Sequence, residues 1–97
     1  MRLKSSEIEE IKQVAKECFG TGAKVYLFGS RTDNTKKGGD IDLYIETTAK
    51  ENLFDKKIKM LRMLYERLGE QKIDIVVNNH TKPLYIHKVA REEGIIL

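Results

Sequence analysis

The sequence predicts a small α/β domain of the two-layer α+β kind, in which one sheet carries helices on one face only. The expected elements follow the order helix, strand, strand, helix, strand, helix, which is typical of such a domain. Two of the strands alternate aliphatic and acidic residues, so each has an aliphatic face and a polar face. The chain has 97 residues, which predicts a single domain over 1–97.

The first helix is expected from Ser6 to Phe19. Ser6 can cap it, because Glu9 follows three residues later as in a capping box. Gly20 follows Phe19 and is expected to end the helix. Its apolar stripe consists of Ile8, Ile11, Ala15 and Cys18. The next apolar segment, residues 24–28, is expected to be a short strand.

A polar segment, residues 29–39, precedes a strand over 40–46 and a long amphipathic helix over 50–68. Gly69 is expected to end this helix. Its apolar face is predicted to consist of Phe54, Ile58, Leu61, Tyr65 and Leu68. A third strand is expected over 72–77.

The last part of the chain predicts a helix followed by a short strand. Thr81 and Pro83 indicate a helix start, since proline suits the first helical turn. The helix is expected to end near Gly94, and residues 95–97 (Ile-Ile-Leu) can add a final strand.

Three aspartates share the polar side of the predicted sheet. Asp40 and Asp42 alternate with aliphatic residues in one strand, and Asp74 does the same in another. Two carboxylates about 4 Å apart repel by roughly 4 kcal/mol at an effective dielectric of 20. Such a cluster favours a bound divalent cation, and oxygen ligands suit magnesium or manganese. The alternative is that these acids are merely solvated on an exposed face.

The segment before these acids suits a phosphate group. Residues 27–30 (Leu-Phe-Gly-Ser) run from an apolar strand into a polar stretch. Gly29 lets a ligand approach the backbone, and a helix opening at Ser30 would offer free amide groups to phosphate. An ordinary strand-to-helix turn with Ser30 as a cap is the alternative. Together, the Gly-Ser segment and the aspartates that follow it predict a phosphate-binding loop beside a metal site.

The combined motif carries a family resemblance. Residues 28–31 (Phe-Gly-Ser-Arg) and 40–43 (Asp-Ile-Asp-Leu), with nine residues between Ser30 and Asp40, resemble the signature of the nucleotidyltransferases related to DNA polymerase beta. The short length is similar to the minimal nucleotidyltransferases, and the ending 90–97 agrees. The resemblance implies the nucleotidyltransferase fold, with a small mixed sheet. Residues 38–39 (Gly-Gly) depart from the more polar residues usual there.

The resemblance also implies roles for individual residues. Gly29 and Ser30 would bind the β- and γ-phosphates of ATP, and Asp40 and Asp42 would coordinate two magnesium ions. Asp74 would be the third acid, which binds the metal near the nucleophile and helps to deprotonate it. The implied reaction transfers a nucleoside monophosphate to an acceptor hydroxyl and releases pyrophosphate.

Minimal nucleotidyltransferases are commonly encoded beside a small HEPN-domain protein, so the resemblance implies an antitoxin paired with a ribonuclease toxin. The implied modification is transfer of AMP to a tyrosine of that toxin, and an oligomer with the partner is expected. Transfer to a small molecule such as an aminoglycoside is one alternative. A non-catalytic antitoxin that acts by contact alone is another, although such a binder has no need of Asp40 and Asp42. The base preference, the acceptor residue and the number of monophosphates added cannot be predicted.

The composition of the chain argues against some classes of binding partner and some locations. The formal net charge is +3, and there is neither a basic tract nor an interleaved aromatic series, which argues against direct nucleic-acid binding. No apolar run is long enough to span a bilayer, and residues 1–6 lack the apolar stretch expected of a secretory signal. The one cysteine, Cys18, cannot form an internal disulfide, which fits the cytoplasm.

Several other residues could have functional roles but are explained as well or better by ordinary structural ones. Arg31 is as well explained as a solvated residue at a helix start as by a phosphate contact. His80 and His87 lack a matching pair of ligands at zinc spacing. Cys18 lies in an apolar stripe and is expected in the core, and Glu46 is expected at the rim of the acidic face.

Overall fold

The computed structural model describes residues 3–28, 41–69, 71–78 and 94–97. The elements in these residues are α1 (Ser5–Phe19), β1 (Lys24–Phe28), β2 (Ile41–Glu46), α2 (Leu53–Leu68), β3 (Ile73–Val77) and β4 (Ile95–Ile96). The first three strands and β4 therefore lie where the sequence predicts them. The helix predicted from Thr81 and Pro83 lies outside the described residues, and so does Asp40, the expected start of the second strand. In the part of the chain that is described, no helix has the length and apolar character needed to cross a membrane.

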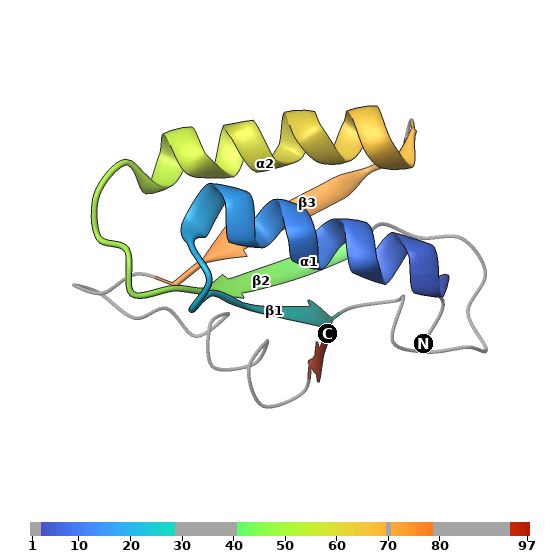
Figure 1. Cartoon of the computed structure of the whole chain (residues 1–97), viewed down its shortest axis with the longest axis horizontal. Coiled ribbons are helices and arrows are strands. Elements are labelled where there is room, and N and C mark those ends of the chain that lie inside the picture. Colours follow the sequence, from blue (N-terminus) through green and yellow to red (C-terminus); the bar gives the residue numbers. More distant parts are fainter. Residues whose placement is uncertain (1–2, 29–40, 70, 79–93) are drawn as a thin grey trace.

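The four strands form one mixed sheet in the order β3-β2-β1-β4. β1 pairs antiparallel with both β2 and β4, whereas β2 and β3 run parallel. Helices α1 and α2 lie side by side on the same face of this sheet (Figure 1). The prediction of a small mixed sheet covered by helices on one face is confirmed.

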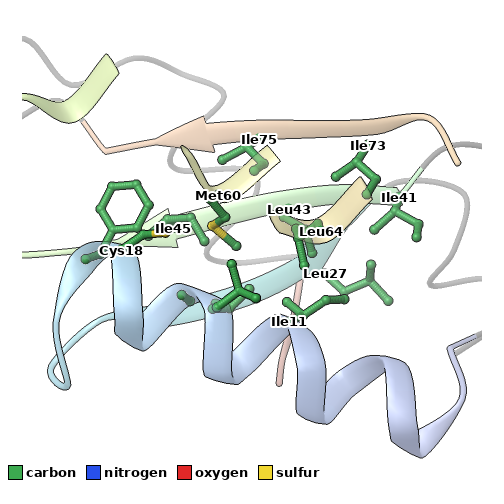
Figure 2. Packing of buried hydrophobic residues seen from close by; sticks show 14 residues of the cluster. Ile11, Cys18, Leu27, Ile41, Leu43, Ile45, Met60, Leu64, Ile73 and Ile75 are labelled. Atoms are coloured by element: carbon green, nitrogen blue, oxygen red, sulfur yellow. The ribbon is translucent and has the colours of Figure 1, made fainter. Parts of the chain in front are cut away.

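The core lies between the sheet and the two helices, as Figure 2 shows. Ile41, Leu43 and Ile45 of β2 are fully buried there, and Ile73 and Ile75 of β3 are 3% exposed. These are the aliphatic residues of the alternating pattern, so the period of two places the acids on the opposite face. Cys18 is buried in the same cluster, as predicted, and burial raises the pKa of its thiol.

Helix α1 begins one residue earlier than predicted, and Ser6 is not its cap. Lys4 is the capping residue, and its backbone N–H donates to Glu7 Oε1 at 3.0 Å. Glu7 therefore takes the role predicted for Glu9, because a carboxylate three residues after the cap reaches back to the backbone of the capping residue. Gly20 ends the helix as expected, with φ 97° and its N–H bonded to the Lys16 carbonyl at 2.9 Å.

Helix α2 ends as predicted, but a different side of it is buried. Gly69, with φ 82°, closes the helix by donating to the Tyr65 carbonyl at 3.1 Å. The fully buried side chains of α2 are Met60 and Leu64, while Phe54 is 71% exposed and Tyr65 is 45% exposed. The predicted apolar face thus forms the flank of the buried side rather than its centre. Helix α1 occupies the opposite flank, where Arg67 bonds Glu10 at 3.1 Å.

Candidate active site

Two of the three predicted acids lie side by side in the sheet. The register of the parallel pair places Asp42 on β2 directly beside Asp74 on β3. Residues opposite each other on neighbouring strands point to the same face, and such strands lie about 4.8 Å apart. Since Ile41 and Leu43 face the helices, Asp42 and Asp74 lie on the face away from them. Asp42 is half-buried and Asp74 is exposed.

The predicted phosphate-binding motif begins one strand away from this pair. Phe28, the last residue of β1, is the cross-strand partner of Asp42. Phe28, Asp42 and Asp74 therefore form one row across three strands, and Gly29 follows Phe28 directly in the chain. The end of β1, where the predicted phosphate-binding motif begins, therefore lies in the same row as the two carboxylates.

The other predicted site residues lie outside the described part of the chain. These are Gly29, Ser30, Arg31 and Asp40. Asp40 directly precedes Ile41, whose backbone N–H donates to the Lys72 carbonyl at 2.9 Å. The structure therefore places Asp42 beside Asp74, while the roles of all six residues remain predictions. His80 and His87 also lie outside the described residues.

Hydrogen bonds at both ends hold the register that pairs the two acids. The Ile41–Lys72 bond precedes the paired acids, and at the far end Asn78 N–H donates to the Ile45 carbonyl at 3.1 Å. The Asn78 side chain then accepts from Thr47 N–H at 2.8 Å and donates to the Thr47 carbonyl at 3.1 Å. Asn78 thus continues the ladder between β2 and β3 after Val77, the last residue of β3. Sequence reasoning missed this residue, and its only signal was an amide side chain at the end of an aliphatic strand.

The polar face is only partly open, because one of its aromatic residues is almost fully buried. Next to Asp42 on this face, Tyr44 is only 2% exposed and packs against its cross-strand partner Tyr26, with ring centroids 5.7 Å apart. Tyrosine can bury its ring on a face that also carries acids, because its apolar area is large and its hydroxyl is polar. The two acids therefore lie beside a pair of packed tyrosines rather than on a uniformly solvated face.

Glu46 lies on the same face but apart from the acid pair. It is four residues beyond Asp42 on β2, which is about 13 Å along a strand. Its cross-strand partner is Lys24, and its Oε2 atom is buried without a hydrogen-bond partner. This position agrees with the rim assigned to Glu46 and separates it from Asp42 and Asp74.

The chemistry of the paired acids fits a hard divalent cation. Carboxylate oxygens are the ligands that magnesium and manganese prefer, and adjacent strands present two of them to the same side. Among the described residues, no group of three or more His, Cys, Asp or Glu side chains gathers as a metal site. A complete site therefore needs a further ligand, and Asp40 is the one that the sequence offers.

Comparison with known families agrees with this arrangement. The family described as "Polymerase beta, Nucleotidyltransferase" matches residues 9–97, which include the Gly-Ser motif, all three acids and the last strand. Neither the curated proteins nor the solved structures include a match to this chain. With nearly the whole chain matched, and with the mixed sheet and paired acids in place, the chain belongs to the polymerase beta nucleotidyltransferase family.

Proposed function

We propose that this nucleotidyltransferase transfers AMP from ATP to a hydroxyl group of a partner protein, with magnesium as the required ion. The observation that carries the proposal is the register that pairs Asp42 with Asp74 on the face of the sheet away from the helices, one strand from Phe28, which precedes the Gly-Ser motif in the chain. The family match supports nucleotidyl transfer as the reaction class.

The residues of the chain have separate tasks in this proposal. Asp42 and Asp74, with Asp40, would hold the divalent ions, and Gly29 and Ser30 would receive the triphosphate, with Arg31 as a further phosphate contact. When bound, the ions supply positive charge to the phosphate oxygens and lower the pKa of the acceptor hydroxyl. The protein contributes positioning, since orientation of a phosphate and an attacking oxygen accounts for much of such catalysis.

The partner in this proposal is a HEPN-type ribonuclease toxin, and the acceptor is a tyrosine on it. The chain would then act as an antitoxin that silences the toxin by covalent modification in the cytoplasm. Support comes from the resemblance to minimal nucleotidyltransferases, which follows from the motif at 28–31 and 40–43. Direct binding to nucleic acid has no part in the proposal.

The test is to co-express this chain with the product of the neighbouring gene and to measure the intact mass of the protein that co-purifies. We expect the partner to carry whole AMP increments, and we expect Asp42→Asn to abolish them. The substitution keeps the shape of the side chain but removes the charge that holds the ion. Circular dichroism should show an unchanged fold, so that loss of transfer reports on the chemistry.

Two other results would point to other functions. An unmodified partner that still binds would favour a contact-only antitoxin, and such a protein would not need magnesium-dependent ATP binding. Calorimetry with ATP, with and without magnesium, separates these two cases. If no partner co-purifies, small-molecule hydroxyl acceptors such as aminoglycosides become the substrates to assay.

A further inference from the structure

Helix α2 carries an apolar stripe that no described part of the chain covers. We call Phe54, Ile58, Leu61 and Tyr65 the outer stripe. Phe54 is 71% exposed, Tyr65 45% and Ile58 37%, and Leu61 is half-buried beside the core. Single exposed apolar residues are ordinary, but three on one flank of a helix form a contiguous patch.

The outer stripe lies on the side of α2 that faces away from α1. Contacts with α1 occur on the other flank, where the Cys18 thiol donates to the Met63 sulfur at 3.8 Å and Arg67 bonds Glu10 at 3.1 Å. Beneath α2 lies β3, which is the edge strand of the sheet in the described residues. Figure 1 shows α2 above β3 at this border, with α1 on the inner side. The stripe therefore lies at the outer border of the two-layer domain.

The spacing of the outer stripe reads the same in both directions. Its residues follow one another at intervals of four, three and four positions. When two such helices pack antiparallel about a two-fold axis near the middle of the stripe, Phe54 of one copy meets Tyr65 of the other. Ile58 then meets Leu61 in the same way. A contact between identical patches requires this kind of self-complementarity.

Two of the charges beside the stripe have the same symmetry. Asp55 and Arg62 lie two helical turns apart along the solvent border of the outer stripe, and both are exposed. Neither forms an ion pair in the described part of the chain. The antiparallel arrangement that aligns the apolar residues also places each Asp55 near Arg62 of the other copy. Glu51 and Glu66 would lie at the two ends of the contact, where crossing helices diverge.

We propose that a second copy of this chain covers the outer stripe, through an antiparallel α2–α2 contact about a two-fold axis. The exposed side chains amount to roughly 300 Å² of apolar surface, since a buried aromatic contributes about 200 Å². This is less than the roughly 800 Å² that each partner contributes to a standard interface. The dimer is therefore reversible, with a dissociation constant on the order of 10–100 μM.

The test is sedimentation velocity over a concentration series that spans about 5–500 μM, which brackets that dissociation constant. We expect the unaltered chain to shift from monomer to dimer within this range. Arg62→Asp and Asp55→Arg each bring like charges together at two places, and each should raise the dissociation constant at least about tenfold. The double variant Asp55→Arg/Arg62→Asp restores both pairs and should return the constant to within about threefold of the original value.

Two further variants test whether the contact is formed by this side of α2. Lys59→Asp changes an exposed charge on α2 away from the stripe and should leave the dissociation constant unchanged. Phe54→Glu should abolish the dimer while circular dichroism reports an intact fold, since this side chain is mostly exposed. A chain that stays monomeric at every concentration would overturn the proposal. So would a double variant as weak as the single ones, because Asp55 and Arg62 of the two copies would then not lie beside each other.

Discussion

At the residue scale, the two paired acids have unequal surroundings. Asp42 is half-buried on a central strand between Phe28 and Asp74, whereas Asp74 is exposed on β3, an edge strand of the sheet formed by the described residues. A carboxylate on a central strand is held by neighbours on both sides, while one on an edge strand has a neighbour on one side only. If the proposed function holds, we expect Asp42 to hold the more fixed position in the site and Asp74 the position more open to an acceptor.

This assignment predicts the effect of Asp74→Asn. Loss of one ligand charge should lower the transfer rate at least about a hundredfold. The free energy of unfolding should not fall, because the side chain is exposed and the substitution removes a like charge beside Asp42. The rate is measured from the intact mass of the partner over time, and the free energy from urea unfolding.

Glu46→Gln is the matched control for this prediction. Glu46 shares the face and the charge of Asp74 but lies about 13 Å along the strand from Asp42. Its substitution should leave the transfer rate within about threefold of the original value. Equal losses in the two variants would show that the acidic face acts through its overall charge rather than through a paired site.

At the scale of elements, the pairing of β2 with β3 depends on one side chain beyond the strands. Asn78 forms two side-chain hydrogen bonds to the backbone of Thr47, which is 4% exposed. Asn78→Ala leaves the Thr47 N–H and carbonyl without these partners, which should cost about 1–3 kcal/mol of stability. Urea unfolding measures the loss, and hydrogen exchange at the Thr47 amide should accelerate.

A second substitution at the same position separates the two bonds. Asn78→Asp keeps an acceptor for the Thr47 N–H but loses the donor to the Thr47 carbonyl, so its loss should be smaller than that of Asn78→Ala. If both variants unfold at the urea concentration of the original chain, the strand pairing does not depend on this side chain.

The sequence predicts the strands of this chain better than the orientation of its helices. The alternation in β2 and β3 predicted both the buried faces and the face of the acids, because a strand has only two sides. A helix can present any direction to its neighbours, so the stripe from Phe54 to Tyr65 was recognised as apolar, but it forms the flank of the buried side rather than its centre. Ser6 was mistaken for a cap because the choice depends on a single bond, from Lys4 N–H to Glu7.

At the scale of the whole molecule, the site depends on contacts between distant segments, and the sequence alone does not give them. The acids Asp42 and Asp74 were expected to share a sheet face, but their direct pairing depends on β2 and β3 running parallel in one particular register. Likewise, the packing of Tyr44 against Tyr26 follows from the register of β1 and β2. Composition and periodicity describe each element separately, whereas register is fixed when helices and sheet close on a common core.

Packing over that core gives the last prediction, which compares two apolar residues of α2. Leu64 is fully buried between the helices and the sheet, whereas Phe54 is 71% exposed. Leu64→Ala removes packed methyl groups and leaves a cavity, so it should lower the free energy of unfolding by about 2–5 kcal/mol. Phe54→Ala removes a larger side chain but little buried surface, and its cost should stay below about 1 kcal/mol. Urea unfolding at a few micromolar keeps the chain monomeric, so any contact between copies does not contribute. Comparable losses in the two variants would mean that α2 presents its outer stripe to the core, and the α2–α2 contact would then lose its apolar surface.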